Sequence, residues 1–373
     1  MQIDKRAPLR VSVSVALVLL LGNTAEADNG FNSLSDMFTY SGFGTAGVAR
    51  SDTNRAEFVI DNQMAGATEN FDYKTDSKLG LQGTFAPTSW LSATVQAIAM
   101  EQDSSAIITQ IEWAYLKVQP IADLSIRYGK MELPLFLVSD SRNVGYTTTW
   151  LRAPDAVYGE ALFDTYEGGD IGYTLELGKY SVTAHALLGA PNPVAQLAGP
   201  RFAQIFTGHR MYGYDVTADL NIVTVRASVL ELGYRTYSNG ALNQDGNYHF
   251  YGVGVAYDRN NIIAQGEFIE LRTGDPTDAV NGWYVMGGYR LGKWTPYLIY
   301  ANSHQNQAAG GTVPDMNGPT ESVGVRLDLF RSVDFKAQFD HAKAFDYGTP
   351  FINILPGFNN KANIFSLAAD FVF

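Results

Sequence analysis

Cysteine is absent from the chain, and so are long apolar runs. Without cysteine there can be no disulfide, no thiol nucleophile and no thiolate metal site. No window reaches the roughly 18 consecutive apolar residues that a membrane-spanning helix needs, which excludes a helical membrane protein. Charged residues make up only 17% of the chain, below the figure of about one quarter that is usual for soluble domains.

Basic residues are also scarce, because 26 Lys and Arg face 38 Asp and Glu, for a net charge of −12. Phosphate binding needs a basic face, so we expect no nucleic-acid partner. The five histidines are scattered without the HExxH spacing of a zinc site, and no G-x-S-x-G nucleophile turn occurs. We therefore predict no metal, no cofactor and no catalytic residue, and we expect that the protein is not an enzyme.

The first residues predict an export signal that is removed from the mature protein. A basic start (residues 5–10) precedes an apolar core (11–22) and an A-x-A cleavage site (25–27). A short N-terminal anchor is the alternative, although the apolar run is too short to span a bilayer. We predict a cleaved signal peptide over residues 1–27 and a mature chain over 28–373, in a bacterial envelope because cysteine is absent.

Beyond this signal, apolar and polar residues alternate in stretches of about ten residues, and no capped amphipathic helix is found. In SVDFKAQFDHAK, Phe335 and Phe339 fall on one face, and Lys336 and Asp340 fall on the other. A period of two residues indicates a β-strand with one face in an apolar medium and the other in water. Strands of a soluble sandwich alternate too, so this pattern alone does not separate the two architectures.

Sixteen such stretches follow one another, and an even number is typical of bacterial outer-membrane barrels. We predict strands at 38–49, 77–86, 90–100, 109–119, 122–131, 165–177, 180–190, 212–221, 223–234, 248–258, 260–271, 282–291, 293–302, 320–330, 332–343 and 363–373.

The connections between these strands alternate in length. Seven are tight turns, and the others are mostly long and rich in Gly, Asn, Asp and Pro: 50–76, 101–108, 132–164, 191–211, 235–247, 272–281, 303–319 and 344–362. A soluble sandwich has no reason to collect all short turns at one end, whereas an outer-membrane barrel has short periplasmic turns and long outer loops. The sequence therefore predicts an all-β fold, a transmembrane antiparallel barrel surrounded by outer-membrane lipid.

The last residues, NIFSLAADFVF, place Phe365, Leu367, Phe371 and Phe373 on one face. An ordinary final strand would alternate in the same way. A terminal phenylalanine after this pattern resembles the C-terminal strand by which bacterial outer-membrane proteins are recognised for assembly. We therefore expect the barrel assembly machinery as a partner, through the strand that ends at Phe373.

A family resemblance rests on three stretches: DSKLGLQ (76–82), IEWAYLKV (111–118) and LSIRYGKMELPLFLVSDSRNVGYTTTWLRAPDAVYG (124–159). They resemble Gram-negative outer-membrane porins, in particular a proteobacterial porin-like family of the general trimeric type. The resemblance implies a sixteen-stranded barrel, often trimeric, through which small hydrophilic solutes and ions diffuse passively. On this basis we expect a homotrimer, and we expect the third outer loop to fold into the lumen and to set the size of the pore.

That third loop, 132–164, is far too long for a turn. Its apolar residues 133–138 are suited to pack against the inner wall, and its polar residues 139–143 to face the water path. Acidic loop side chains opposite basic wall side chains would form a charged constriction that selects ions and orients dipolar solutes. We predict that this constriction contains Arg127, Asp140, Arg142, Asp155, Arg326 and Lys336. Further inward side chains are predicted to line the pore: Gln82, Gln96, Glu112, His185, Arg226, Glu267 and Arg290.

The predicted function is a water-filled outer-membrane channel. An adhesin or a structural barrel without a conducting pore is the main alternative, and an outer-membrane lipase is a weaker one. Conductance in a planar bilayer would distinguish these three functions, because only the channel gives stepwise current.

Overall fold

A computed structural model describes residues 34–60, 63–102, 105–161, 163–191, 197–199, 202–238, 241–273, 279–305, 316–344 and 350–373. The predicted signal peptide, residues 1–27, lies outside these described residues.

The described chain forms one closed antiparallel barrel. Its sheet has 17 strands, of which the short β9 (Leu197–Gly199) pairs only with β10, so sixteen strands make up the wall. They are β1 (Phe38–Ser51), β3 (Lys78–Thr88), β4 (Leu91–Glu101), β5 (Ile107–Ile121), β6 (Leu124–Glu132), β7 (Thr165–Leu177), β8 (Tyr180–Pro191), β10 (Phe202–Asp219), β11 (Val223–Ser238), β12 (Ala241–Arg259), β13 (Ile262–Thr273), β14 (Ala279–Tyr289), β15 (Trp294–Gln305), β16 (Met316–Phe330), β17 (Val333–Lys343) and β19 (Lys361–Val372).

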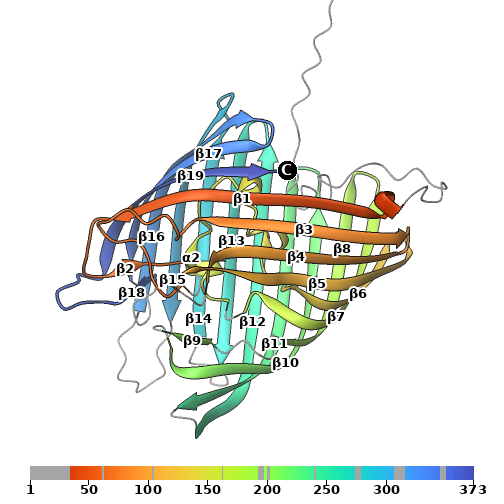
Figure 1. The fold of residues 1–373 in the computed structure, drawn as a ribbon, viewed down its shortest axis with the longest axis horizontal. Helices are drawn as coiled ribbons and strands as arrows, with labels where there is room; N and C mark the ends of the chain where they lie inside the picture. The colour runs from red at the N-terminus through yellow and green to blue at the C-terminus, as the bar shows by residue number, and fades with distance from the viewer. Residues whose placement is uncertain are drawn as a thin grey trace, which may run out of the picture.

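The barrel closes where the first strand meets the last. β1 pairs with β3 on one side and with β19 on the other, and Figure 1 shows it lying between them. Every wall strand therefore has two hydrogen-bonded neighbours, as lipid requires, because the hydrocarbon region offers no water to unpaired peptide groups. No helix in the described part of the chain is long and apolar enough to cross a bilayer.

Connections of two to four residues collect at one end of the barrel, as predicted. Left-handed backbone conformations close several of these turns, at Gly178 (φ 71°), Gly292 (φ 66°), Asn260 (φ 51°) and Asn261 (φ 67°). Glycine and asparagine adopt positive φ at the least cost, so these residues suit tight hairpins. Sixteen wall strands are thus confirmed, and the connection lengths alternate as predicted except between β11 and β12: the predicted loop 235–247 is wrong, because the two strands pair as far as Ser238 and Ala241.

The predicted strands were too short in one region. β10 and β12 have 18 and 19 residues, and both extend toward the long-loop end well beyond the predicted ranges 212–221 and 248–258. The extension is a ribbon outside the lipid, where neither face needs to be apolar. The apolar alternation that marks a strand in lipid therefore ends before the strand does.

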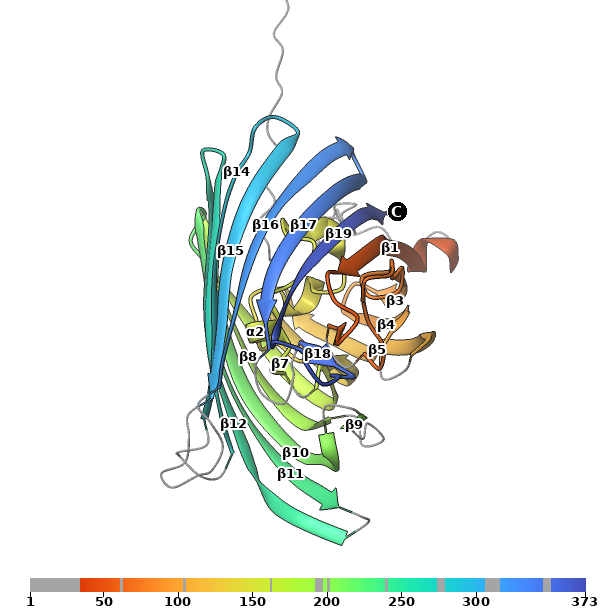
Figure 2. The same ribbon diagram turned by 90° about the vertical axis from the view of Figure 1, so that its left-hand side faces the viewer.

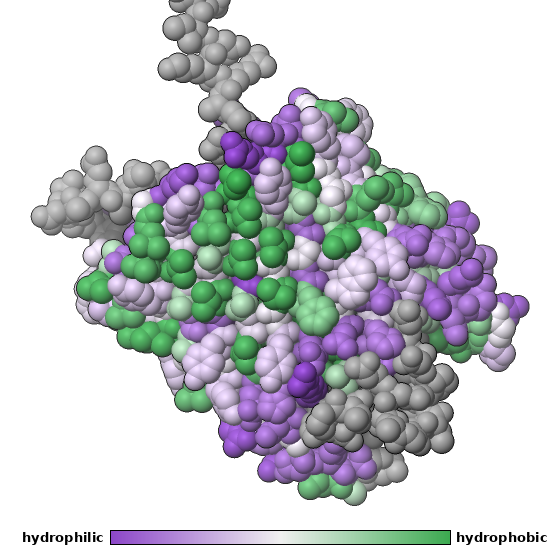
Figure 3. Space-filling model, turned by 180° about the vertical axis from the view of Figure 1, so that it is seen from behind, coloured by the Kyte–Doolittle hydropathy of each residue, from purple (hydrophilic) through white to green (hydrophobic). Residues whose placement is uncertain are grey.

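Side chains alternate between the outside and the lumen. On β17, Phe335 and Phe339 are 40% and 43% exposed on the outer wall, whereas Lys336 and Asp340 are 2% and 3% exposed on the inside. Figure 3 shows apolar side chains gathered over the outer wall of the strands at the back, with hydrophilic residues toward the edges. An apolar outer belt is the surface that a bilayer demands.

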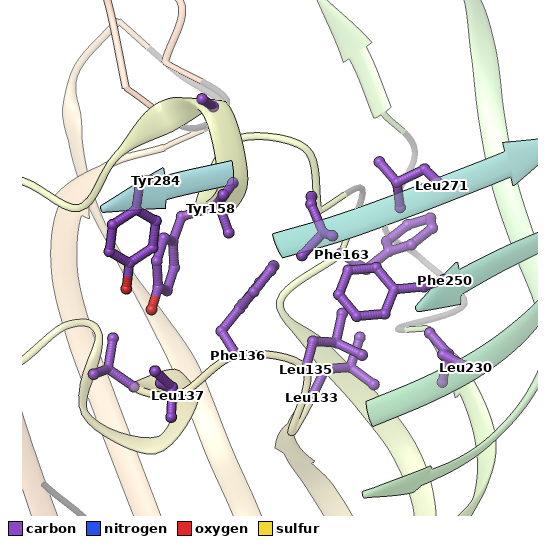
Figure 4. Close-up of a cluster of buried hydrophobic side chains, with 14 of the residues drawn as sticks. Leu133, Leu135, Phe136, Leu137, Tyr158, Phe163, Leu230, Phe250, Leu271 and Tyr284 are labelled. Carbon is purple, nitrogen blue, oxygen red and sulfur yellow. The ribbon is translucent and has the colours of Figure 1, made fainter. Parts of the chain in front are cut away.

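The apolar core lies inside the barrel. The connection from Leu133 to Asp164 folds into the lumen and carries the 3-10 turns η2 (Ser139–Ser141) and η3 (Gly145–Thr147) and the short helix α2 (Asp155–Tyr158). Figure 2 shows α2 inside the curved wall. Its apolar residues pack against inward side chains of β10 to β15, as predicted for 133–138, and Figure 4 shows Phe136 among these neighbours.

The first and last outer connections form a small cap at the long-loop end. β2 (Glu57–Phe58) pairs with β18 (Phe351–Ile352), and the rings of Phe58 and Phe351 meet at 5.9 Å between centroids. The remaining short element is η1 (Leu34–Met37), before β1.

The outer belt yields a prediction about stability in lipid. Leu298, in the middle of β15, is 65% exposed on the outer wall, and Leu298→Arg should lower the free energy of unfolding by about 2–4 kcal/mol, because it places a charge in hydrocarbon. Denaturant titration in phospholipid vesicles measures this change. Leu242→Arg is the control, since Leu242 is 56% exposed at the start of β12 beyond the lipid and should show a much smaller effect. Equal losses at both positions would contradict the proposed membrane boundary.

Candidate functional site: the lumen and its inserted loop

The ends of the inserted loop are joined at its base. The amide of Leu133 donates to the carbonyl of Asp164 at 2.8 Å, so the chain enters and leaves the lumen at the same point. Arg142 reaches back to this base, where Nη1 lies 2.5 Å from Oδ1 of Asp164. The loop is thereby a closed unit whose position depends on its contacts with the wall.

The first arm of the loop is held by polar side chains of β11 and β13. Arg226 donates to the carbonyl of Pro134 at 2.9 Å, and Ser228 donates to that of Leu135 at 2.6 Å. The amide of Leu137 donates to Glu267 at 2.9 Å. An irregular segment has no neighbouring strand, so the wall must satisfy its backbone groups.

Glu267 also ties the helix α2 to this arm. Its carboxylate accepts hydrogen bonds from the hydroxyl groups of Tyr158 and, at 2.7 Å, of Tyr284. Burial, together with the nearby carboxylate, raises the pKa of Tyr158 well above its usual value, so the hydroxyl keeps its proton and remains a donor. Figure 4 shows the two tyrosine rings side by side above Leu137.

The tip of the loop is bound by two basic side chains of β16 and β17. Arg326 donates to the carbonyls of Tyr146 (2.8 Å) and Thr148 (2.6 Å), and Lys336 donates to that of Gly145 (2.6 Å). The hydroxyl of Tyr146 donates to the carbonyl of Arg331, in the short turn between these strands. The tip therefore reaches almost to the short-turn end of the barrel.

Carboxylates balance these two basic groups. Asp334 lies 3.1 Å from Arg326, and Asp370 lies 2.9 Å from Lys336. Thr45 of β1 donates to Asp370 as well, at 2.5 Å. The charged network thus spans the seam where β1 meets β19.

The returning arm is fixed by Arg152. Its guanidinium donates to both oxygens of Asp76 (2.9 and 2.8 Å), to Asp340 (2.8 Å) and to Ser366 (2.6 Å), and it lies over the ring of Phe58. Burial alone would lower the pKa of Arg152, but the two carboxylates raise it, so the group is a charged, fully paired cation. One side chain therefore joins the loop to the cap and to the last two strands.

A second pair of charges lies on the opposite wall. Arg127 of β6 binds both oxygens of Asp170 of β7, with Nη2 at 2.7 Å, and it lies over the ring of Tyr115. Asp140 of the loop is exposed and close enough for its charge to act on Arg127. No ion pair within 4 Å joins Asp140 to Arg127 in the described part of the chain, so the two charges act on each other without direct contact.

Other predicted pore residues have local partners. Gln96 donates to Gln82 at 3.0 Å, and Nδ1 of His185 lies 3.2 Å from Asp215, which also binds Arg226 at 3.0 Å. Asp155 lines a small cavity between the loop and the wall at β1 and β3, together with Arg142 and Lys78.

Two predicted lining residues occupy unusual positions. Glu112 is buried at a bulge of β5, where the pairing with β4 shifts by one residue. Arg290 lies in the turn after β14 and is exposed, bound to Asp258 at 2.6 Å. It is therefore at the short-turn rim and not on the inner wall.

The inward direction of these charged wall residues was predicted, but the prediction did not include that the loop would cover them. Lys336, Glu267 and Arg226 are only 2%, 6% and 8% exposed, because the loop lies over them and uses them as hydrogen-bond partners. These side chains anchor the loop instead of facing water. Alternation gives the direction of a side chain and says nothing of what lies above it.

The two halves of the inner wall differ in character. Apolar side chains of the loop pack mainly against β10 to β15, and also against Met131, Tyr166 and Leu187 on β6 to β8 and against Ile98 on β4. The rest of the inner wall of β3 to β8 is a polar half, with paired side chains such as Thr84 and Thr94 (3.0 Å) and Thr174 and Thr183 (3.0 Å). Asp170 and Lys117 also belong to this polar half and were not predicted, although alternation through Arg127 and Tyr115 would have placed them inward.

Metal binding has no support in the described residues, since no group of three or more His, Asp or Glu there is arranged to hold an ion.

The network around Arg152 predicts how firmly the loop is held. Arg152→Gln should lower the free energy of unfolding by about 3–5 kcal/mol, because Asp76 and Asp340 are left buried without a cation. Denaturant titration in vesicles measures this loss. Arg235→Gln is the matched control, since its pair with Asp245 is solvent-exposed and should matter little. A loss at Arg152 no larger than that at Arg235 would show that the network does not fix the loop.

Comparisons with known proteins agree on the fold. No family model matches the sequence, and no curated protein matches it either. Solved structures do match: OmpF of Salmonella typhi in complex with daunomycin has a TM-score of 0.61 at 12% identity, covering 90% of this chain and 97% of that one.

Two further structures give the same result. The anion-selective porin from Comamonas acidovorans has a TM-score of 0.60 at 12% identity, covering 90% of this chain and 99% of that one. The trimer form of in-vitro folded OmpT, an outer membrane protein of Vibrio cholerae, has a TM-score of 0.58 at 14% identity. The match covers 91% of this chain and 100% of that one. The chain therefore has the closed sixteen-stranded fold of Gram-negative outer-membrane porins.

Proposed function

We propose that this protein is an outer-membrane porin, a water-filled channel for passive diffusion of small hydrophilic solutes and ions. One observation carries the proposal: the inserted loop packs mainly on the β10 to β17 side of the lumen, whereas the opposite wall keeps partly exposed polar side chains at Ser92, Lys117 and Arg127. An apolar outer wall excludes water, and a polar inner wall retains it. No covalent step and no cofactor is involved.

The narrowest part of the proposed channel lies between Asp140 on the loop and the wall at Arg127. Loop charge and wall charge of opposite sign create a field across the water path, which orients dipolar solutes and discriminates between ions. The other predicted constriction residues belong to the loop or hold it in place. Arg142 binds the base of the loop, Arg326 and Lys336 bind its tip, and Asp155 lies in its returning arm.

Several properties of the mature protein follow as proposals. Residues 1–27 direct export and are then cleaved off. The barrel assembly machinery binds the strand that ends at Phe373. A homotrimer is supported by the trimer form of the similar Vibrio cholerae OmpT and by a hollow on the outer wall with a floor of Ala46, Ala337 and Ala369. Light scattering of the detergent-solubilised protein, corrected for bound detergent, measures the subunit number.

Planar-bilayer recording of the purified protein tests the channel itself. The expected record contains stepwise current increases whose size is roughly proportional to salt concentration. Insertion without current would contradict the proposal and favour an adhesin or a structural barrel.

The role of Asp140 is tested by the reversal potential in a salt gradient. Asp140→Asn should shift the preference toward anions, because it removes an exposed negative charge from the loop side of the path. Asp123→Asn, which removes an exposed charge from the turn between β5 and β6, is the control. Equal shifts in both variants would mean that Asp140 acts only as general surface charge.

A further inference from the structure

Most lumenal cations are compensated by carboxylates within 4 Å. This holds for Arg127, Arg142, Arg152, Arg226, Arg326 and Lys336. A compensated cation acts on a passing ion as part of a dipole, so its influence falls off quickly with distance. The sign of the pore wall is therefore set by whichever charge lacks such a partner.

Lys117 is a charge of this kind. Its neighbours Leu116 and Val118 point outward, so the Lys117 side chain projects into the lumen from β5. It is partly exposed, and across the described residues no hydrogen bond or ion pair links it to a carboxylate. The charged groups that act on it are Arg127, its register partner on β6, and Asp170.

The local charges do not cancel. Asp170 binds Arg127 through both carboxylate oxygens and accepts a further hydrogen bond from the hydroxyl of Tyr166 at 2.8 Å. Its single negative charge is thus directed at Arg127. At the level of Lys117, two cations (Lys117 and Arg127) against one carboxylate leave one positive charge, while Glu112 and Glu132 lie farther along β5 and β6 and are buried.

The surface on the other side of Lys117 is neutral and able to form hydrogen bonds. Ser92 of β4 is its register partner there, and Thr94 and Gln96 follow on the same inner face. The pairs Thr84–Thr94 and Gln82–Gln96 hold this face in place at 3.0 Å each. Thr94 and Gln96 are themselves buried, so a small anion at Lys117 would meet the partly exposed hydroxyl group of Ser92 and one ammonium group.

We propose that Lys117 supplies the uncompensated positive charge that shifts the ion preference of the pore toward small anions such as carboxylates and phosphate, in addition to the effect of Asp140 on the loop side. This inference rests on the proposed channel function. In this arrangement Arg127 is paired with Asp170, and Lys117 supplies the uncompensated positive charge of the wall. Asp140 supplies a negative charge on the loop.

The test is the reversal potential of single channels in potassium chloride and potassium acetate gradients. Lys117→Met keeps the length of the side chain and removes its charge, and Lys117→Gln is a second neutral variant. The ratio of anion to cation permeability should fall about twofold to fivefold, the effect of one unit charge at about 4–8 Å across water. Lys117→Arg should retain the wild-type ratio.

Lys179→Met is the matched control, because Lys179 lies in the short turn between β7 and β8, outside the pore. An unchanged ratio in Lys117→Met, or an equal change in Lys179→Met, would overturn the assignment while leaving the channel function intact. Absence of current from the wild-type protein would instead remove the channel function and this inference with it.

Discussion

Peptide groups inside a bilayer have no water to bind, and this constraint underlies the whole architecture. It requires every strand to have two neighbours, so β1 pairs with β19 as well as with β3. Closure in turn fixes the two faces of each strand, since one must meet lipid and the other encloses a lumen. The apolar outer belt and the inward polar groups are both consequences of the same pairing.

The same constraint applies to the loop that enters the lumen, in a different form. An irregular segment cannot satisfy its own backbone, so side chains of the wall take over: Ser228 and Arg226 on one arm, Arg326 and Lys336 at the tip. Buried charges used in this way need counter-charges, which explains why acidic residues such as Asp334 and Asp370 accompany them on the inner face. These pairs lie on the β10 to β17 side and at the seam, so in the proposed channel the water path runs along the partly exposed polar side chains of the opposite wall.

Much of the fold could be predicted from the sequence because its signals are local. Alternation along 332–343 separates Phe335 from Lys336 without knowledge of any other strand. The constriction remains a prediction, and the sequence did not indicate that the loop covers Lys336 and Glu267. The partners of Arg152 lie 76 and 188 residues away in the sequence, and no local pattern specifies such pairs. β10 and β12 were predicted too short because their outer ends leave the lipid.

The bonds of Arg152 also imply an order of assembly. Asp76 precedes β3, whereas Asp340 and Ser366 belong to the last two strands, so these partners come together only when β19 has joined β1. Before that, the guanidinium has no complete set of acceptors, and the returning arm of the loop has no fixed place in the lumen. The barrel must therefore close before the loop takes a fixed position in the lumen. In an intermediate that has not closed, the strands would be paired but the width of the lumen would not yet be defined.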